Sequence, residues 1–239
     1  MNNLEILMDG LKKLNIEVNE EKLNKLLNFK EIMLRWNENI NLTSITDEKE
    51  IFIKHYLDSA TCLSTQIIKS GDKIIDVGTG AGFPGMVVKI LKDDINLTLL
   101  DSLKKRTAYL EEVTNILSLK NIEIIHGRAE EYGQKKEYRE MYDVALSRAV
   151  APLNVVLEYC LPFVKEEGYF LCQKGPSYKE ETKEAEKALE VLGGKFEKVE
   201  EYSLPYSDIK HYVIVIKKIK STPTKYPRKP GKPSANPIK

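Results

Sequence analysis

The sequence lacks the features of disulfide-stabilised secreted proteins and of membrane proteins. Its 239 residues include three cysteines, far apart and never in a C-x-x-C pair, so we expect reduced thiols and no metal site. No apolar run approaches the ~20 residues that span a bilayer, and the first residues lack the basic and apolar regions of a secretory signal. These absences predict a cytoplasmic chain with no membrane partner.

The sequence also lacks a large net charge, because 37 basic residues nearly balance 36 acidic ones. The charge is uneven, however, since residues 217–239 hold seven lysines and one arginine but no acid. The same segment holds five prolines, a density that neither a helix nor a strand tolerates. We therefore predict an exposed, extended tail at residues 218–239, whose charge suits a polyanionic partner.

The first 70 residues show helical spacing and no strand pattern. A short helix is expected over the leucines from Leu4 to Leu14, and a second helix over residues 20–34. Residues 35–43 are rich in asparagine and are expected to be irregular. A third helix is predicted from Asp47 to about Leu63. Residues 1–70 are thus predicted to form an N-terminal helical extension.

From Gly71 onward, short β-branched runs alternate with helical segments. Seven strands are predicted, at 73–77, 97–101, 122–125, 142–147, 168–173, 195–202 and 211–216. Helices are predicted at 85–92, 104–117 and 178–192. This alternation specifies a mostly parallel sheet with helices on both faces, and the closing hairpin-like pair implies one antiparallel strand. The fold expected for residues 71–217 is therefore α/β and Rossmann-like.

A glycine-rich turn follows the first predicted strand, and its register fits two cofactors. Residues 80–85 match the dinucleotide pattern G-x-G-x-x-G, whereas Asp76, Gly78, Gly80 and Gly82 match the acid-first pattern of S-adenosylmethionine enzymes. Asp76 favours the second, because a carboxylate attracts that cofactor's ammonium and sulfonium groups and repels a pyrophosphate. No substrate domain follows the sheet, which also disfavours a dehydrogenase. The glycines alone would also fit a tight turn without a ligand.

Two further loops are candidates for holding the nucleoside part of the cofactor. Asp101, followed by Ser102, ends the second predicted strand, where its two oxygens suit both ribose hydroxyls of either cofactor. The alternative is that Asp101 only caps the next helix. Ala129 and Glu130 follow the third strand, in the loop that lies beside the adenine in such folds. Their alternative role is a helix start with acids that favour the macrodipole.

The fourth predicted strand ends without the Asp/Asn-Pro-Pro-Tyr motif that holds exocyclic amines, and no Pro-Cys nucleophile follows it. It reads Ser147-Arg148-Ala149 instead. A ring nitrogen such as guanine N7 needs neither motif, because its in-plane lone pair attacks a methyl group directly, without a base or a covalent intermediate. Positioning and electrostatics then carry the catalysis. Arg148 is the positioning candidate, for the acceptor base or for the cofactor carboxylate, unless it pairs with a helix acid.

Taken together, these motifs resemble the bacterial 16S ribosomal RNA guanine-N7 methyltransferases, also called the glucose-inhibited division protein B family. The shared motifs are Trp36-Asn37, Asn41-Leu42-Thr43, His55-Tyr56-Leu57-Asp58-Ser59, Asp76 through Gly85, Leu100-Asp101-Ser102, Lys105-Arg106, Ser147-Arg148-Ala149 and Tyr226-Pro227-Arg228-Lys229-Pro230-Gly231. The resemblance implies a class I methyltransferase fold with an N-terminal helical extension, and S-adenosylmethionine as cofactor. It also implies one guanine of 16S rRNA in the small ribosomal subunit as substrate. The cofactor contacts implied by matching motifs are Gly78, Phe83, Ala129, Glu130 and Arg148.

The basic tail agrees with an RNA substrate, because exposed cations bind phosphates in a salt-dependent way without reading bases. The residues assigned to RNA are Lys225, Arg228, Lys229 and Lys232 in the tail, extended by Lys104, Lys105 and Arg106. A solvated tail without a role is the alternative. A flipped guanine would need a flat platform, for which Phe83, Tyr56 and Arg148 are candidates.

Three functions fit the sequence. The first is an rRNA guanine-N7 methyltransferase, which we expect to be a monomer. The second is a methyltransferase acting on a small molecule or a protein, which would leave the basic tail without a purpose. The third is a nicotinamide-binding module without catalysis.

Overall fold

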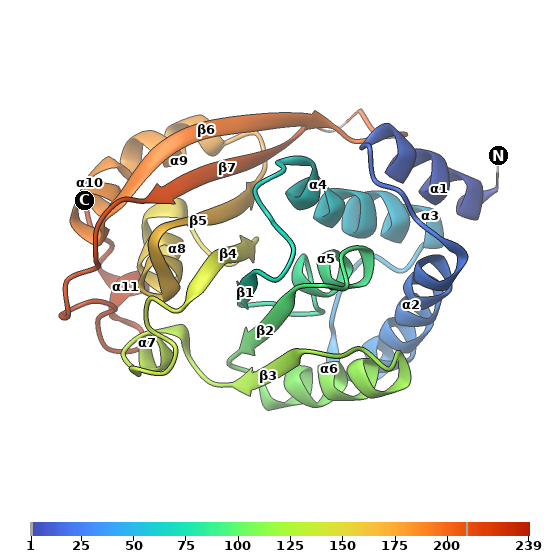
Figure 1. Ribbon diagram of the computed structural model, residues 1–239, viewed down its shortest axis with the longest axis horizontal. Helices are drawn as coiled ribbons and strands as arrows, with labels where there is room; N and C mark the ends of the chain where they lie inside the picture. Colours follow the sequence, from blue (N-terminus) through green and yellow to red (C-terminus); the bar gives the residue numbers. More distant parts are fainter. Residues whose placement is uncertain (1, 209) are drawn as a thin grey trace.

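The structure is a computed structural model that describes residues 2–208 and 210–239; Met1, in the predicted helical extension, and Ile209, between the last two predicted strands, lie outside the described residues. A seven-stranded sheet in the order β3-β2-β1-β4-β5-β7-β6 forms its centre (Figure 1). The strands are β1 (Lys73–Val77), β2 (Asn96–Asp101), β3 (Ile122–His126), β4 (Tyr142–Arg148), β5 (Val164–Lys174), β6 (Gly194–Ser203) and β7 (Lys210–Lys218). The predicted Rossmann-like α/β fold is confirmed.

Strand direction follows from the connections. Helical crossovers connect the successive strands from β1 to β5, and every pairing among these strands is parallel. The crossover helices are α5 (Gly85–Leu91), α6 (Lys104–Ile116), α7 (Ala129–Tyr132) and α8 (Leu153–Cys160). A short loop joins β6 to β7, so β7 runs antiparallel to both of its neighbours, and one antiparallel strand is confirmed. Strand order reverses between β1 and β4, the position where open α/β sheets bind ligands.

Two apolar cores cover the faces of the sheet. Successive residues of β1 point to opposite faces, so Ile74 belongs to one core and Ile75 to the other. The first core contains α5, α6, α1 (Asn3–Lys13), α2 (Glu20–Ile40), α3 (Glu48–Ile51) and α4 (Asp58–Ser64). The second contains α8, η2 (Leu161–Phe163), α9 (Tyr178–Glu184) and α10 (Glu186–Leu192). The N-terminal helices are thus part of the packing on the sheet.

The predicted helix from Asp47 to about Leu63 is present and contains a π-helical segment. Its middle, η1 (Phe52–Leu57), has π geometry between α3 and α4. Single π segments are rare and occur often at functional sites. This one carries Lys54 and His55, which line a cavity together with Arg148 of β4.

The end of the second helix was predicted too early. α2 continues to Ile40 and ends at Asn41, which adopts a left-handed conformation with φ of 46°. The supposedly irregular segment is helical because it packs on α6, where Trp36 Nε1 donates to Glu112 at 3.1 Å. Asparagine content alone misplaced the boundary by several residues.

Two other helical predictions need correction. The helix predicted over residues 178–192 is two helices, α9 and α10, which meet at Ala185. α8 was not predicted at all, although its side chains are almost all buried. A helix that is apolar on most sides lacks the amphipathic period that identifies surface helices.

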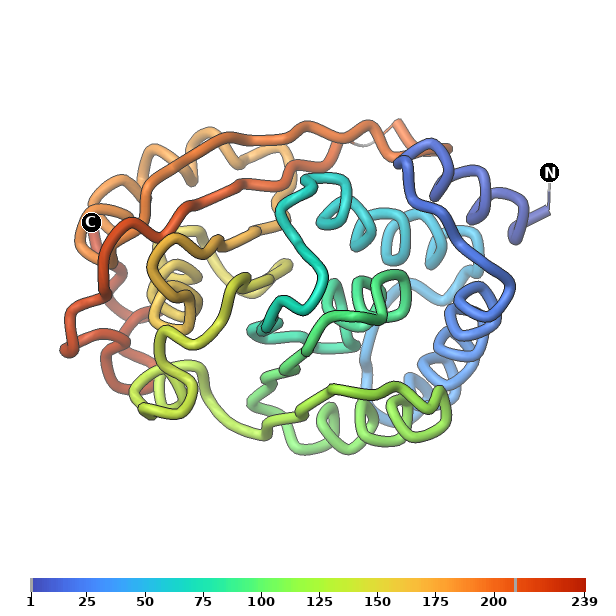
Figure 2. The backbone as a smooth tube through the Cα atoms, viewed as in Figure 1, coloured from blue at the N-terminus to red at the C-terminus, as the bar shows by residue number. Residues whose placement is uncertain are grey.

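The C-terminal tail is folded against the domain, so the prediction of an exposed, extended tail is wrong (Figure 2). Arg228 Nη2 donates at 2.6 Å to Glu158, a fully buried side chain of α8. Arg139 donates to the tail carbonyls of Thr222 and Tyr226 at 2.6 and 2.8 Å. The last turn, α11 (Lys232–Ala235), also packs on α8. Side chains of the domain supply the hydrogen bonds that a proline-rich segment cannot make to itself.

Candidate active site

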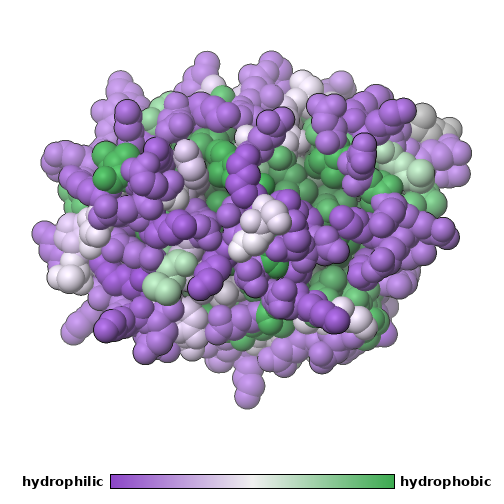
Figure 3. Space-filling model, viewed as in Figure 1, coloured by the Kyte–Doolittle hydropathy of each residue, from purple (hydrophilic) through white to green (hydrophobic). Residues whose placement is uncertain are grey.

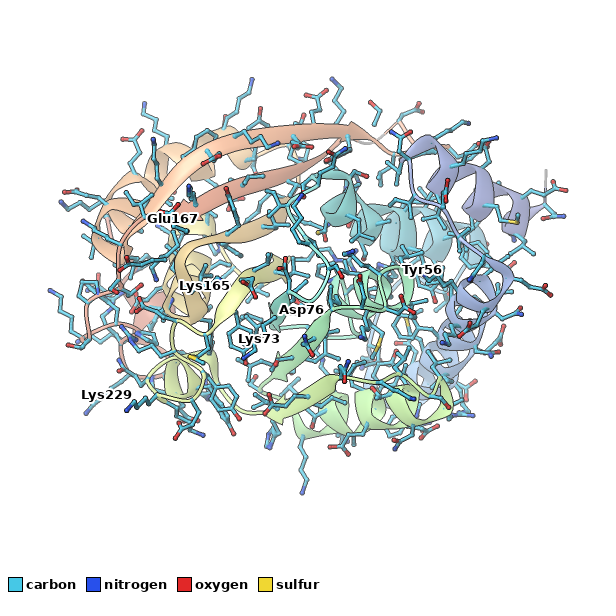
Figure 4. The ribbon with its side chains drawn as sticks, in the orientation of Figure 1. Tyr56, Lys73, Asp76, Lys165, Glu167 and Lys229 are labelled. Atoms are coloured by element: carbon cyan, nitrogen blue, oxygen red, sulfur yellow. The ribbon has the colours of Figure 1, made fainter. Side chains whose placement is uncertain are left out.

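Asp76 supports the glycine turn from beneath. Its Oδ2 accepts hydrogen bonds from Thr79 Oγ1 and Gly85 N, both at 2.8 Å. The side chain is fully buried near the centre of the molecule, and burial raises its pKa to about 6 (Figure 4). Two cavities lie beside the turn, and Asp76 lines neither of them. This placement does not support the predicted direct contact between Asp76 and an ammonium group, and it assigns the carboxylate to the shape of the turn.

Close contacts explain two of the glycines. A Cβ at Gly85 would lie 2.8 Å from Asp76 Oδ2, and a Cβ at Gly78 would lie 2.7 Å from Val150 Cγ2. Gly78 also has a φ of +72°, which other residues rarely adopt. Gly82, predicted to bind the cofactor, faces the core and lines neither cavity.

Two joined cavities lie along the turn at the carboxyl ends of the strands. The larger, of about 390 Å³, is lined by predicted residues Gly80, Phe83 and Arg148. The smaller, of about 150 Å³, is lined by the predicted residues Ala129 and Glu130. The residues that line both cavities are Gly78, Asp101, Ser102 and Val150. The fold therefore brings most of the predicted cofactor residues to two neighbouring cavities that share part of their lining.

Asp101 stands where the two cavities meet and is almost fully buried. Its Oδ2 accepts from Gly80 N and its Oδ1 from Leu103 N, both at 2.9 Å. The second bond goes to Leu103, the residue before α6, and α6 has no side-chain cap hydrogen bond, so the alternative that Asp101 only caps this helix is not supported. Arg106, predicted to contact RNA, lines the larger cavity, with Nη1 3.4 Å from Asp101 Oδ2.

Arg148 is held at the rim of the larger cavity by three groups. Its Nη1 donates to Asp58 Oδ2 at 2.8 Å and to the Lys54 carbonyl at 3.2 Å, and its Nη2 lies 3.2 Å from His55 Nδ1. The guanidinium carbon lies 4.9 Å from the ring centre of Phe83. The predicted alternative, pairing with a helix acid, is thus observed, because Asp58 begins α4. The same pairing orients Arg148 toward the cavity that it lines.

The charge states in this cluster follow from burial and from neighbouring charges. Burial, followed by the charge of Arg148, lowers the pKa of His55 to about 4, so the ring is neutral at neutral pH. Its Nδ1 then accepts from Arg148, and its Nε2–H donates to Thr43 Oγ1 at 2.8 Å. Burial raises the pKa of Asp58, but bonds from His211 and the charge of Arg148 outweigh it and lower the pKa. Asp58 is therefore an ionised carboxylate.

Sequence reasoning missed several residues that line these cavities: Leu42, Thr43, Thr79, Ala81, Arg128 and Tyr159. Thr43 belongs to a motif that signalled the family without signalling a site. Tyr159 lies on α8, the unpredicted helix, and its hydroxyl is 2.8 Å from Ser234 Oγ of the tail. Only the packing of α8 and the tail brings that ring to the smaller cavity.

The aromatic platform predicted for a flipped base is not supported. Tyr56 is fully buried, with its hydroxyl donating to the Leu26 carbonyl at 2.8 Å. The Phe83 ring is covered by His55, whose ring centre lies 4.5 Å away, and by Arg148. The Tyr56 ring is thus unavailable for stacking, and the Phe83 ring already stacks against His55.

The residues predicted to contact RNA differ in availability. Lys104, Lys105, Lys225, Lys229 and Lys232 are exposed, and Figure 4 shows Lys229 at the edge of the molecule. Arg228 is committed to Glu158 and is mostly buried, so its assignment to RNA is corrected. Over residues 2–208 and 210–239, no group of three or more His, Cys, Asp or Glu side chains is placed to hold a metal ion, and no helix is long and apolar enough to span a bilayer.

A family model described as rRNA small subunit methyltransferase G matches residues 22–210. The chain belongs to this family. It is 56% identical over 235 residues to the ribosomal RNA small subunit methyltransferase G of Alkaliphilus oremlandii, with 98% of each chain covered. It is 51% identical to the protein of the same name from Acetivibrio thermocellus, covering 98% of this chain and 96% of that one. The resemblance found in the motifs is confirmed, and the nicotinamide-binding alternative is overturned.

Solved structures support the fold. A SAM-dependent methyltransferase from Aquifex aeolicus is 19% identical and superposes with a TM-score of 0.54, covering 75% of this chain and 97% of that chain. The YcgJ protein from Bacillus subtilis is 12% identical, with a TM-score of 0.53, covering 70% of this chain and 100% of that one. At such identities the likeness concerns the fold alone, because one fold hosts many reactions.

Proposed function

We propose that this chain transfers the methyl group of S-adenosylmethionine to N7 of one guanine in 16S ribosomal RNA, in the cytoplasm. The shared name of its relatives supports ribosomal RNA of the small subunit as the substrate. The observation that carries the choice of a ring nitrogen is the end of β4, where Arg148 stands in place of a motif that holds an amine.

The joined cavities fit an elongated nucleoside cofactor. Ala129 and Glu130 would border the adenine in the smaller cavity, and Asp101 would bind the ribose hydroxyls where the cavities meet. The glycine turn and Arg148 would hold the methionine end in the larger cavity. When bound, the cofactor supplies an electrophilic methyl group on a positively charged sulfur.

The reaction places few chemical demands on the protein. The N7 lone pair forms the new carbon–nitrogen bond while the carbon–sulfur bond breaks. The electron pair of the broken bond stays on sulfur. The positive charge moves to the purine, and no proton is lost. The side chains therefore need only align the reactants and surround them with fixed charges. Asp58 serves this purpose by balancing Arg148, since a lone buried cation would oppose the charge that develops on the guanine.

The cations of the tail and of α6 are proposed to bind rRNA phosphates. Lys225, Lys229 and Lys232 are exposed on a tail that the domain holds in place, while Lys104 and Lys105 open α6. A fixed array of cations loses less conformational entropy on binding than a disordered tail would.

The test is transfer of a tritiated methyl group to small subunits that lack the modification, to free 16S rRNA and to a small-molecule fraction. We expect label in the RNA, at a position that borohydride and aniline cleave, which reports 7-methylguanosine. Label confined to proteins or metabolites would support the second function considered from the sequence instead. Label in the RNA without cleavage would reject N7 as the acceptor.

A further inference from the structure

A cavity of about 830 Å³ adjoins the larger cofactor cavity. The two share His55, Arg148, Ala149 and Val150, so a molecule in one lies next to a molecule in the other. The 830 Å³ cavity lies between η1, the loop after β4, the end of β5 and α9. Its volume is within the range of about 300–1,000 Å³ that small-ligand sites occupy. It therefore has the size and the position of an acceptor site.

The walls of this acceptor cavity are apolar and its floor is polar. The apolar lining is made of Ile45, Ala149, Val150, Ala151 and Pro152. Small aliphatic side chains of this kind contact the faces of a flat ring without demanding hydrogen bonds. The floor includes Asp58, Gln173 and His211, from three different elements.

The floor has two buried polar atoms without a hydrogen-bond partner in the described residues. Gln173 Nε2 donates to the Asp58 carbonyl at 2.6 Å and to Thr61 Oγ1 at 3.1 Å, which fixes the amide orientation. Its Oε1 is buried and has no partner within the described residues. His211 Nδ1 pairs with Asp58 Oδ1 at 2.9 Å, and its Nε2 is likewise buried without a partner there. A buried polar atom without a partner costs free energy, and the amide oxygen of Gln173 can only be satisfied by a donor.

The rim adds one free carboxylate, whereas the cations beside it are committed. Glu184, exposed on α9, makes no hydrogen bond or ion pair within the part of the chain that the structure describes. Lys174 donates to the Ala151 carbonyl at 2.6 Å and to Glu181 at 2.7 Å. Lys54 is paired with Glu50. The Gln173 amide oxygen and the Glu184 carboxylate, which are left without partners in this cavity, are therefore both hydrogen-bond acceptors.

We propose that this cavity receives the target guanine, with N7 toward Arg148 and the Watson–Crick edge toward Gln173 and Glu184. The N1–H and N2–H₂ groups of guanine are adjacent donors, which match the unpaired acceptors, whereas adenine presents a ring acceptor at N1. The O6 atom beside N7 faces Arg148. Three bonds to Asp58, Lys54 and His55 leave two of the five N–H groups of Arg148 available.

This inference rests on the proposed function, and changing the base tests it without disturbing a buried residue. Small subunits are reconstituted with inosine at the target position, which keeps N7, O6 and N1–H but lacks the N2 amine. We expect kcat/KM for methyl transfer to fall about 10- to 100-fold relative to guanosine, because acceptors lose a donor on the substrate. Equal rates on the two bases would overturn the proposal.

A variant of the rim supplies the matching test from the protein side. Glu184→Gln keeps the shape of the side chain and removes its charge, and Glu180→Gln on the same helix, outside the cavity, is the control. We expect Glu184→Gln to lower kcat/KM about 10-fold on guanosine and less on inosine, with an unchanged Kd for S-adenosylmethionine. Equal behaviour of the two variants, or equal losses on both bases, would remove Glu184 from the base-binding edge.

The unaltered protein distinguishes a failure of the proposed function from a failure of the cavity assignment. If the unaltered protein places no label at N7 of 16S rRNA, the proposed function fails, and the cavity assignment fails with it. If it labels N7 of guanosine but tolerates inosine fully, the function stands and only the assignment of the cavity to the Watson–Crick edge is lost.

Discussion

Asp76 is enclosed by the turn that it supports, with Oδ2 bonded to Thr79 and Gly85, while Oδ1 is buried and unpartnered in the described residues. Burial raises its pKa to about 6 from an ordinary value of 3.8. Because the native state holds this proton more tightly than the unfolded state, its contribution to stability is complete below about pH 4. The contribution is lost as the pH rises through about 6.

Asp76→Asn should therefore change the pH dependence of stability. Between pH 4 and pH 7 we expect the unaltered protein to lose about 3 kcal/mol of unfolding free energy relative to the variant, from a shift of roughly two pKa units. Urea unfolding at four pH values measures this difference. Asp93→Asn, at an exposed position, is the control. A constant gap between Asp76→Asn and the unaltered protein would contradict the assignment.

Asp101 contributes at the same scale through its position where the two cavities meet. Asp101→Ala should weaken S-adenosylmethionine binding by roughly 1–3 kcal/mol through the loss of charged hydrogen bonds, as calorimetry would measure. Asp101→Asn keeps an acceptor for Gly80 N and separates turn support from ribose binding. Unchanged affinity in both variants would remove Asp101 from the cofactor site.

At the scale of elements, the tail and α8 form one unit. Glu158 of α8 accepts from the backbone and the side chain of Arg228, and Tyr159 of the same helix contacts Ser234. The tail amide of Gly231 donates to Glu130 at 3.0 Å, beside the smaller cavity. A segment predicted to be exposed and extended thus supports, through α7 and α8, the side of the site proposed for the adenine.

Arg228→Ala should destabilise the protein by about 3–5 kcal/mol, because it leaves the buried carboxylate of Glu158 without its partner. Thermal or urea unfolding measures the loss. Lys229→Ala, at an exposed neighbour, should stay within about 0.5 kcal/mol of the unaltered protein. A double variant, Arg228→Met with Glu158→Gln, should recover part of the loss. An Arg228→Ala protein as stable as Lys229→Ala would show that the ion pair is dispensable.

At the scale of the whole molecule, we expect the distribution of charge, more than apolar surface, to determine binding to rRNA. The face in Figure 3 is mostly hydrophilic, and the chain as a whole carries a net charge of only +1. Attraction to rRNA must therefore come from local arrays of cations, because the molecule has almost no net field. The tail lysines and those that open α6 are two such arrays.

Replacing Lys225, Lys229 and Lys232 by alanine should weaken binding of small subunits without changing cofactor affinity. The slope of log affinity against log salt should fall by about 0.7–0.9 for each lysine that contacts a phosphate. Filter binding at several salt concentrations measures the slope. A triple variant with an unaltered slope would take the tail out of the RNA interface.

Local patterns predicted the parts of this protein that depend on neighbouring residues. The β-branched runs predicted all seven strands, and the glycine turn and Asp101 lie beside the cavities proposed for the cofactor. Long-range contacts decided the rest. α2 extends past Trp36 because of Glu112, and Arg148 is oriented by Asp58, a residue 90 positions earlier.

The sequence alone determined the succession of the seven strands along the chain, the glycine turn after the first strand and the family, because each depends on short-range periodicity or on contiguous motifs. Only the tertiary structure decided that Asp76 supports the turn, that the tail is folded and that a third cavity opens beside Arg148. These outcomes depend on burial and on partners distant in the chain. Arg228 shows this most clearly. Its charge suggested a contact with RNA, but in the structure it pairs with Glu158 of α8.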